Sequence, residues 1–253
     1  MKGGKLGTTK NKLLIVIPTY NEKENIENLI RLLLEIESKP DILVVDDNSP
    51  DGTGEILDKL ALKHKESISV IHRTEKLGIG SAHVKGFKYA IKQDYQYILT
   101  MDADFSHHPK YIQKMIDKSK DFPLVIGSRY IEEGGTKSWG LLRQINSRAA
   151  NLLAKKMLHI KCNDCTGGFR LYKKEVLMSI DLDKIYSNGY SFLIEILYKC
   201  QLNGFQISEI PIIFEDRRAG SSKISKNEIF KAIKTLLRYW IKSAPKNKSH
   251  RNL

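Results

Sequence analysis

The segment Tyr97-Ile-Leu-Thr-Met-Asp102-Ala-Asp104-Phe-Ser-His-His108-Pro109 lies near the middle of this 253-residue chain. It begins with a short apolar run, typical of a buried strand, and two carboxylates separated by one residue follow. Because successive side chains of a strand alternate faces, Asp102 and Asp104 project from the same side of the strand end. Two hard oxygen ligands so arranged suit Mg²⁺ or Mn²⁺, which bind one or two carboxylates together with substrate phosphates. A lone Asp-x-Asp would favour a turn, but phosphate-seeking groups elsewhere in the chain favour a metal–nucleotide site.

Strand-like and helix-like patterns alternate around this segment. Apolar, β-rich runs predict strands at residues 12–17, 41–45, 68–71, 97–101 and 123–126. Between the first four of these strands, apolar residues recur at helical spacing, which predicts an α/β fold with a mostly parallel central sheet and helices on both faces. Ligands of such sheets bind beyond the carboxyl ends of strands. The polar clusters fall at those ends: Pro18-Thr-Tyr-Asn-Glu22, Asp46-Asp-Asn-Ser-Pro-Asp-Gly-Thr53 and Asp102-Ala-Asp104.

The second half of the chain is less regular. Residues 143–158 and 189–202 are predicted to be helices, and residues 205–214 a strand in which Pro211 marks an edge or a bulge. Ser225-Lys-Asn-Glu228 is a capping-box pattern that predicts the start of a last helix, about residues 226–242. Its apolar face includes Phe230 and Trp240, and its basic face carries Lys231, Lys234, Arg238 and Lys242.

Composition and charge narrow the class of protein. A hydrophobic content of 41% and an aromatic content of 8% favour a folded domain over a disordered chain. No apolar run approaches the ~18 residues that span a bilayer, and the N-terminal residues lack the apolar core of a secretory signal, so we expect an intracellular chain, soluble or bound to a membrane surface. Most of the net charge of +13 lies in residues 217–253, where Glu228 is the single acid. Cys162, Cys165 and Cys200 are expected to be reduced thiols, because no second Cys/His pair accompanies the first two.

Two loops admit both a structural and a functional interpretation. Residues 46–53 can cap the following helix, or Asp47 and its neighbours can accept hydrogen bonds from a nucleobase or a ribose. Lys76-Leu-Gly78-Ile-Gly80-Ser81 lacks the third glycine and the leading strand of a dinucleotide loop, so glycine-assisted helix entry is the preferred interpretation.

Basic motifs provide candidate phosphate ligands. Arg217-Arg-Ala-Gly-Ser-Ser-Lys223 is either a solvated basic loop or a loop whose cations close over a diphosphate. Arg143 and Ser147, four residues apart, share one face of the predicted helix and can hold a phosphate together.

Several motifs occur in a characteristic order: Pro-Thr-Tyr-Asn-Glu, Val-Val-Asp-Asp-Asn-Ser-Pro-Asp-Gly-Thr, Met-Asp-Ala-Asp-Phe-Ser-His-His-Pro, Gly-Ser-Arg-Tyr, Asn-Ser-Arg-Ala-Ala-Asn, Gly-Gly-Phe-Arg-Leu-Tyr and Asp-Arg-x-x-Gly-x-Ser-Lys. Over residues 13–240 the chain closely resembles the dolichol-phosphate (polyprenol-phosphate) mannosyltransferases, which are inverting glycosyltransferases of family 2 with a GT-A fold. The first two motifs occur in many family-2 enzymes, whereas His-His-Pro and Arg-x-x-x-Ser point to the lipid-phosphate branch.

The resemblance implies roles for individual residues. The guanosine part of GDP-mannose would be held by Pro18, Tyr20, Glu22, Val45 and Asp47. The metal, Mg²⁺ or Mn²⁺, and the diphosphate would be bound by Asp102, Ala103 and Asp104. Some relatives have a glutamine as a further metal ligand where this chain has Ser106. The resemblance therefore does not decide whether Ser106 is a third protein ligand of the metal.

The resemblance also implies an acceptor site and a set of catalytic residues. Arg129 would contact the donor or the acceptor phosphate, and Arg143 and Ser147 would hold the lipid phosphate. Arg217 and Lys223 would bind the diphosphate from a mobile loop. Asp104, Arg129, Arg217 and Lys223 are therefore the expected catalytic group.

The implied reaction transfers mannose from GDP-mannose to dolichyl or polyprenyl phosphate with inversion. The expected organisation is a flexible N-terminus (1–11), a catalytic domain (12–224), an amphipathic membrane-surface helix (225–243) and a basic tail (244–253). We expect a peripheral protein on the cytoplasmic face of the endoplasmic reticulum or the plasma membrane. The sequence does not decide whether a membrane-anchored partner subunit is required.

Two other functions fit part of the sequence. One is the same chemistry with another sugar, such as glucose from UDP-glucose, because the sequence does not reveal which base and which sugar the donor carries. The other is nucleic-acid binding, suggested by the sequence pI of 9.5. We disfavour it because no RNA-binding signature appears and the basic charge interleaves with a wide apolar face, which indicates a membrane surface.

Overall fold

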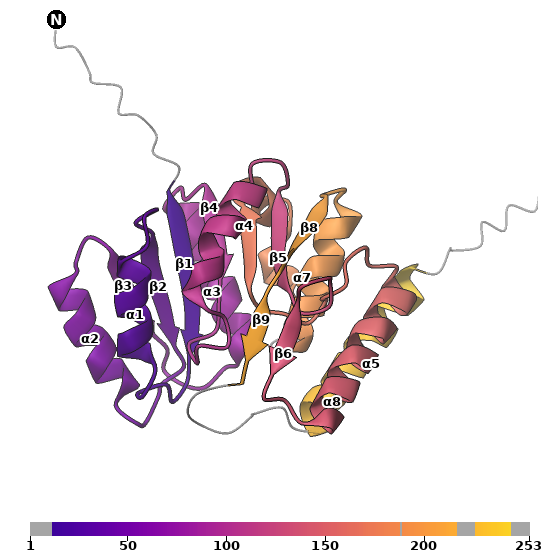
Figure 1. The fold of residues 1–253 in the computed structure, drawn as a ribbon, viewed down its shortest axis with the longest axis horizontal. Helices are drawn as coiled ribbons and strands as arrows, with labels where there is room; N and C mark the ends of the chain where they lie inside the picture. The colour runs from indigo at the N-terminus through magenta and orange to yellow at the C-terminus, as the bar shows by residue number, and fades with distance from the viewer. Residues whose placement is uncertain (1–11, 188, 217–225, 244–253) are drawn as a thin grey trace, which may run out of the picture.

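A seven-stranded sheet forms the centre of the computed structural model, which describes residues 12–187, 189–216 and 226–243 (Figure 1). The strand order is β3-β2-β1-β4-β7-β5-β8. Neighbouring strands are parallel except β7, which is antiparallel to β4 and β5. The strands are β1 (Leu13–Thr19), β2 (Asp41–Asp46), β3 (Ile68–His72), β4 (Tyr97–Thr100), β5 (Leu124–Ser128), β7 (Arg170–Lys173) and β8 (Ile207–Pro211). The mostly parallel α/β fold expected from the sequence is confirmed.

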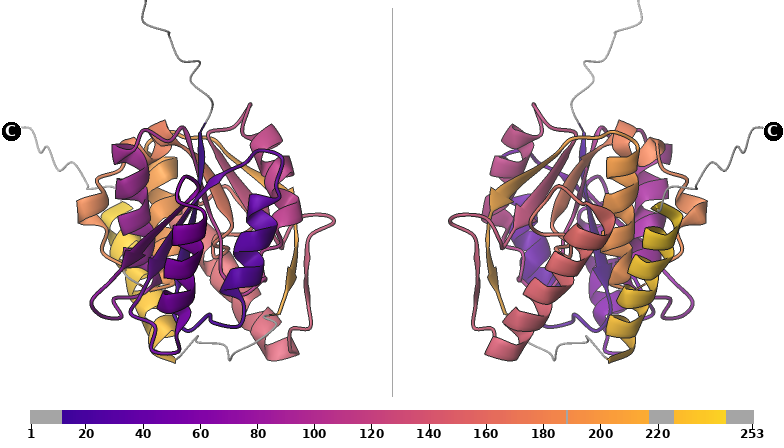
Figure 2. Two further views of the ribbon diagram at one scale, coloured as in Figure 1. Left: turned by 90° about the vertical axis from the view of Figure 1, so that its left-hand side faces the viewer. Right: turned by 90° about the vertical axis from the view of Figure 1, so that its right-hand side faces the viewer.

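Helices cover both faces of this sheet (Figures 1 and 2). One face carries α1 (Ile26–Leu34), α2 (Thr53–Lys63) and α4 (Ile112–Lys118). The other carries α3 (Ile79–Lys92), α6 (Lys174–Met178) and α7 (Ser191–Leu202). Toward the β8 end of the sheet, α5 (Leu141–Leu158) and α8 (Lys226–Ser243) pack against each other.

Strand β1 shows why both faces must be covered. Leu13, Ile15 and Ile17 belong to the apolar cluster shared with α1, whereas Leu14 and Val16 belong to the cluster shared with α3. This alternation is the period-2 pattern of a strand buried on both faces. Helix α3 approaches β1 so closely that a Cβ on Gly86 would lie 2.3 Å from a Val16 methyl group, so only glycine fits there.

The C-terminal strand region differs from its sequence-based prediction. The predicted strand at residues 205–214 is two strands, β8 in the main sheet and β9 (Ile213–Glu215), which pairs with β6 (Gly135–Lys137) in a separate two-stranded sheet. Pro211 ends β8, consistent with its lack of a ladder N–H. Strand β7, inserted antiparallel between β4 and β5, was not predicted.

Candidate active site

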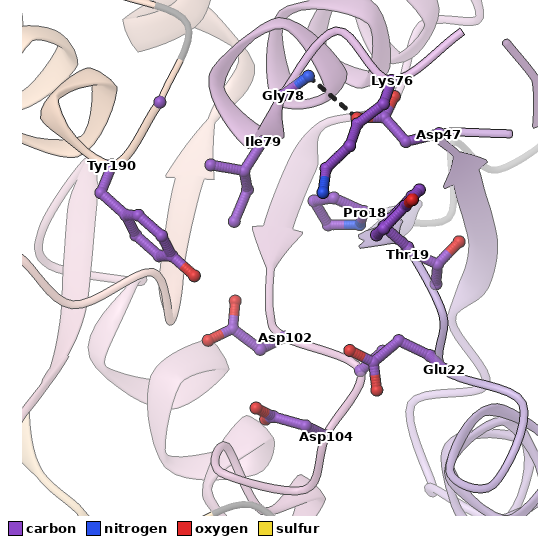
Figure 3. A pocket seen from close by; sticks show the side chains of 13 residues that line it. Pro18, Thr19, Glu22, Asp47, Lys76, Gly78, Ile79, Asp102, Asp104 and Tyr190 are labelled. Carbon is purple, nitrogen blue, oxygen red and sulfur yellow. Dashed lines mark hydrogen bonds between the residues drawn. The ribbon is translucent and has the colours of Figure 1, made fainter. Parts of the chain in front are cut away.

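A cleft opens beyond the carboxyl ends of β1, β2 and β4 (Figure 3). Seven sequence-predicted residues line it: Pro18, Tyr20, Glu22, Asp47, Asp102, Ala103 and Asp104. Val45 does not, because its side chain is fully buried in the core. Asp102, Asp104 and Glu22 lie at one end of the cleft, and Asp47 and Lys76 lie at the other. The polar segments that follow three separate strands therefore meet at one site.

The loop after β4 holds the two aspartates. The Ser106 N–H donates to Asp104 Oδ1 at 3.1 Å, and the Asp102 N–H donates to His107 Nδ1 at 3.0 Å. Phe105 adopts a left-handed φ of 64°, which turns the chain back toward the strand end. These hydrogen bonds fix the backbone of Asp102 and the carboxylate of Asp104. Asp104 is almost fully buried, whereas Asp102 is partly exposed.

The ring of His107 packs against two aromatic side chains beside this loop. It stacks on Phe169, with centroids 5.1 Å apart, and packs edge-on against Phe214 at 5.2 Å. Burial lowers the pKa of His107 to about 4, and this effect outweighs the opposing attraction of Asp104. The ring is therefore neutral at neutral pH, and its Nδ1 can accept the Asp102 N–H. His107 therefore positions the backbone of Asp102. His108 accepts from the Lys110 N–H at the start of a short helix.

The two acids after β2 have different environments. Asp46 is turned into the loop, where it accepts from the Thr19 hydroxyl at 3.2 Å and from the Ser49 N–H and hydroxyl. Asp47 lines the cleft and is held by Arg73 through an ion pair and by the Gly78 N–H at 2.9 Å. Asp46 is therefore a structural residue of the loop, whereas Asp47 belongs to the wall of the cleft.

Several cleft residues were not identified as site residues from the sequence. The Lys76 ammonium lies 3.7 Å from the centroid of the Tyr20 ring, and Lys76, Gly78 and Ile79 all line the cleft. Gly78 begins α3 with a φ of 93°, which confirms the predicted glycine-assisted helix entry. Tyr190, beside the start of α7, lines the opposite wall. The Lys76-x-Gly78 sequence could have indicated that these residues belong to the site. Because it was interpreted as a helix entry and not as a dinucleotide loop, it was not assigned to the cleft.

The predicted acceptor-phosphate residues gather around Trp139. The Arg129 guanidinium lies 5.4 Å from the Trp139 ring centroid, and the Arg143 guanidinium lies 4.1 Å from it. Ser147 is linked to the same group through Tyr130, whose hydroxyl donates to the Ser147 hydroxyl at 2.7 Å. The structure therefore brings the three predicted residues into one neighbourhood.

Internal acids already pair with both arginines. Arg129 makes two hydrogen bonds of 2.7 Å to Asp164, and Arg143 makes one of 2.7 Å to Asp216. Burial opposes ionisation of Asp164, but the adjacent Arg129 guanidinium outweighs burial and holds the pKa of that carboxyl below its usual range. Within residues 12–187, 189–216 and 226–243, Trp139 Nε1 and Arg143 Nε are buried donors without a hydrogen-bond partner. Buried donors without a partner are energetically costly.

Two predicted residues cannot be placed. Arg217 and Lys223 lie outside the described residues. The sequence-based prediction that their loop closes over a diphosphate therefore stays a prediction.

The comparisons with known proteins identify the family. The pattern of the family described as "Glycosyl transferase family 2" matches residues 14–181. The chain belongs to glycosyltransferase family 2. It is 39% identical over 223 residues to the polyprenol monophosphomannose synthase of Mycolicibacterium smegmatis, a match that spans 88% of this chain and 84% of that protein. It is 37% identical over 228 residues to the undecaprenyl-phosphate mannosyltransferase of Micrococcus luteus, a match that spans 90% of this chain and 93% of that protein. The family resemblance expected from the motifs is confirmed.

Solved structures confirm the GT-A-like fold. The glucosyl-3-phosphoglycerate synthase of Mycobacterium tuberculosis, in complex with Mn²⁺, UDP and phosphoglyceric acid, matches with a TM-score of 0.66 and 19% identity. The match covers 91% of this chain and 78% of that one. The same enzyme with Mg²⁺ and UDP gives a TM-score of 0.65 at 18% identity, over 90% and 79% of the two chains.

Proposed function

We propose that the protein transfers mannose from GDP-mannose to dolichyl or another polyprenyl phosphate, with inversion at the anomeric carbon. One observation carries the proposal: two relatives that are 37–39% identical over most of the chain are named for transfer of mannose to, or its linkage with, a polyprenyl phosphate. The site supports it, because a cleft with two aspartates lies in the same domain as two arginines gathered at Trp139.

The chemistry asks for positioning more than for acid–base catalysis. A phosphate monoester is already ionised near neutral pH, so its oxygen attacks the sugar C1 without a strong general base. The acceptor O–C1 bond forms while the bond from C1 to the diphosphate breaks, and GDP leaves with the electron pair. Tyr20, Glu22 and Asp47, which all line the cleft, would hold the nucleoside, and a fixed geometry of this kind can supply a large part of the acceleration.

Asp102 and Asp104 fit a divalent cation. Two adjacent hard carboxylates and a diphosphate are the ligands that Mg²⁺ prefers, and the ion keeps waters at its remaining positions. Such an ion would neutralise charge on the departing diphosphate. In the described part of the chain no group of three metal-binding side chains occurs, so the substrate would complete the coordination. His107 and Ser106 would act indirectly, because His107 holds the backbone of Asp102 and the Ser106 N–H orients the Asp104 carboxylate.

The lipid phosphate would bind at the Trp139 cluster. Arg143 and Ser147 would be its principal ligands, and Arg129, which is paired with Asp164 beside the same Trp139 ring, would be a further contact of the phosphate. Arg143 would then exchange Asp216 for the phosphate, because a dianionic phosphate attracts a guanidinium more strongly than one carboxylate does. The buried donors Trp139 Nε1 and Arg143 Nε support an anion in this place.

The α5–α8 surface supports a membrane-bound acceptor. Helix α8 buries only a narrow stripe, in which Thr235 contacts Ser187 and Tyr239 donates to Glu195 at 2.6 Å. Its wide apolar face stays exposed, with Phe230 67% and Ile241 67% accessible. Helix α5 adds further exposed residues to this surface: Leu141, Leu142, Ile145, Leu152 and Leu153. No described helix is both long and apolar enough to cross a bilayer. We therefore infer peripheral binding, with the acceptor reached from the membrane surface.

A donor panel tests the reaction. The protein is incubated with labelled GDP-mannose, UDP-glucose and other sugar nucleotides, together with a polyprenyl phosphate and Mg²⁺ or Mn²⁺, and the lipid phase is extracted. Label transferred from GDP-mannose alone supports the proposal, and stereochemical analysis of the product tests inversion. Label from UDP-glucose instead would assign the glucosyl reaction, and no label in the lipid phase from any donor would reject lipid-phosphate glycosylation.

A further inference from the structure

A second cavity, of about 430 Å³, lies beside α5 and shares no lining residue with the catalytic cleft. We call it the α5 flank cavity. Its wall is formed by one side of α5 and by the two loops near Tyr130 and Asn163. Of its lining residues, the proposed transfer reaction uses Arg129 but neither Arg148 nor Lys155.

The α5 flank cavity is lined by cations. Arg148 and Lys155 are seven residues apart on α5, which places them on the same side of the helix. Arg129 forms part of the wall, but Asp164 neutralises it. None of the nine lining residues is acidic, and Glu132 and Glu133 in the adjoining loop do not line the cavity. The cavity thus carries an excess positive charge from Arg148 and Lys155.

Part of this cationic wall is held in place. The Lys155 ammonium donates to Asn163 Oδ1 at 2.8 Å. Asn163 is fixed in turn by Glu209, which accepts from its backbone N–H at 2.8 Å and from its side-chain amide at 2.9 Å. Lys155 is therefore oriented by a hydrogen-bond chain that begins in β8, whereas Arg148 is exposed at the rim. An oriented cation beside an adaptable one favours an oxyanion such as a phosphate.

One edge of the cavity is apolar and leads to the exposed surface. Leu152 lines the cavity and is 53% exposed. Leu141 and Ile145 are also exposed, and at about 100° per residue they lie within roughly 40° of Leu152 around the helix. These three residues form an apolar stripe along α5, on the proposed membrane side. A ligand that has a phosphate and an adjoining apolar chain would match both the cations and the stripe, so the site favours an anionic phospholipid over a free anion.

We propose that the α5 flank cavity binds the headgroup phosphate of an anionic phospholipid, with Arg148 and Lys155 as its ligands and the lipid chains along the apolar stripe of α5. This inference rests on the proposed function, which brings the protein to a membrane. The site differs from the proposed acceptor site, because Arg148 follows Ser147 by about 100° and Arg143 by about 140° around the helix. The bound lipid would orient the enzyme on the leaflet without occupying the acceptor site.

A soluble lipid probe tests the proposal. Short-chain dihexanoyl phosphatidylglycerol, kept below its micelle concentration, is titrated calorimetrically into the full-length protein. The double variant Arg148→Gln/Lys155→Gln should bind at least about tenfold more weakly, because both phosphate ligands lose their charge. The matched control Lys59→Gln/Lys63→Gln, which removes two exposed cations of α2 on the other face of the sheet, should bind like the unmodified protein. Arg148→Gln alone, at an exposed position that leaves the fold intact, should show part of the loss.

Other outcomes would overturn the inference. Equal weakening in both double variants would mean general surface electrostatics, and absence of saturable binding would mean that no such site exists. Displacement of the probe by inorganic phosphate at an equal concentration would identify the ligand as free phosphate. An equal rise in the KM for polyprenyl phosphate in Arg148→Gln/Lys155→Gln would assign the cavity to the acceptor. Transfer to polyprenyl phosphate in detergent is measured on the same samples, so that a failure of the proposed function is seen separately.

Discussion

The two sides of the candidate site are built differently. On the donor side, short loops after parallel strands present carboxylates to an open cleft, and Asp102, Asp104 and Asp47 are all oriented by nearby backbone N–H groups or side chains. On the proposed acceptor side, the candidate ligands are arginines that internal acids already hold, Arg129 by Asp164 and Arg143 by Asp216. The proposed donor side is therefore preformed, whereas the proposed acceptor side would have to exchange at least one partner to bind a phosphate.

The largest expected effect concerns the buried pair on the acceptor side. Asp164→Asn leaves the buried Arg129 charge without its partner, and we expect a loss of about 3–5 kcal/mol in the free energy of unfolding, measured by denaturant titration at pH 7. Because the pKa of Asp164 is lowered in the folded protein, its contribution is present above pH 3.8 and is lost as the pH falls through the folded-state pKa. The difference in the free energy of unfolding between the unmodified protein and Asp164→Asn should therefore decrease in acid.

A matched substitution sharpens this comparison. Asp216→Asn breaks the second arginine pair, which is partly exposed, with side-chain accessibilities of 26% for Arg143 and 34% for Asp216. Solvent screens this pair, so the loss should be no more than about 1 kcal/mol. Similar losses in the free energy of unfolding for Asp164→Asn and Asp216→Asn would contradict the expectation that burial makes the Arg129–Asp164 pair the more important of the two.

The next effect concerns the donor side. Asp104→Asn removes a charge that the proposed metal requires, so transfer should fall at least about 100-fold while the thermal unfolding temperature stays nearly unchanged. The same change at Asp117, an exposed aspartate on α4, is the control and should leave transfer unaffected. Full activity of Asp104→Asn in the presence of a chelator would reject the metal assignment.

A smaller effect concerns the α5–α8 surface. Replacing the four cations of α8 by glutamine should weaken binding to anionic liposomes at least about tenfold, because each basic residue near an anionic leaflet contributes on the order of 1 kcal/mol. The binding of the unmodified protein should also weaken with salt. Sedimentation with vesicles measures both effects, and the changed residues are Lys231, Lys234, Arg238 and Lys242.

A control with the same charge change separates location from net charge. Four exposed lysines on α2, on α4 and just after α4, on the other face of the sheet, are replaced by glutamine, and sedimentation should stay unchanged: Lys59, Lys63, Lys114 and Lys120. Unchanged sedimentation of the α8 variant would instead assign that helix to the fold alone and leave recruitment to a partner subunit.

The contrast between the two sides also explains what the sequence could predict. Donor-side residues follow strands that are continuous apolar runs, and Asp102 and Asp104 are placed by the local period of one strand. Parallel strands bring such ends to one edge of the sheet, so the cleft follows from local patterns combined with a general rule of α/β sheets.

Acceptor-side contacts depend on distant parts of the chain. Asp164 contacts Arg129 because β7 is inserted antiparallel beside β5. The four residues of β7 contain no local pattern that predicts this insertion. Asp216 meets Arg143 across 73 positions, and Trp139 gathers both arginines although nothing in its own sequence neighbourhood signals that role. The motifs thus predicted the arginines but not the acids that hold them.

The division into two sides is tested most directly by Arg143→Ala. If α5 serves the acceptor alone, the kcat/KM for polyprenyl phosphate should fall at least about tenfold, because the phosphate loses a charge-assisted partner. Calorimetric titration with GDP-mannose and a divalent cation should give the same dissociation constant as the unmodified protein. A loss of donor binding in that titration, comparable to the loss in transfer, would contradict the account and place Arg143 on the donor side.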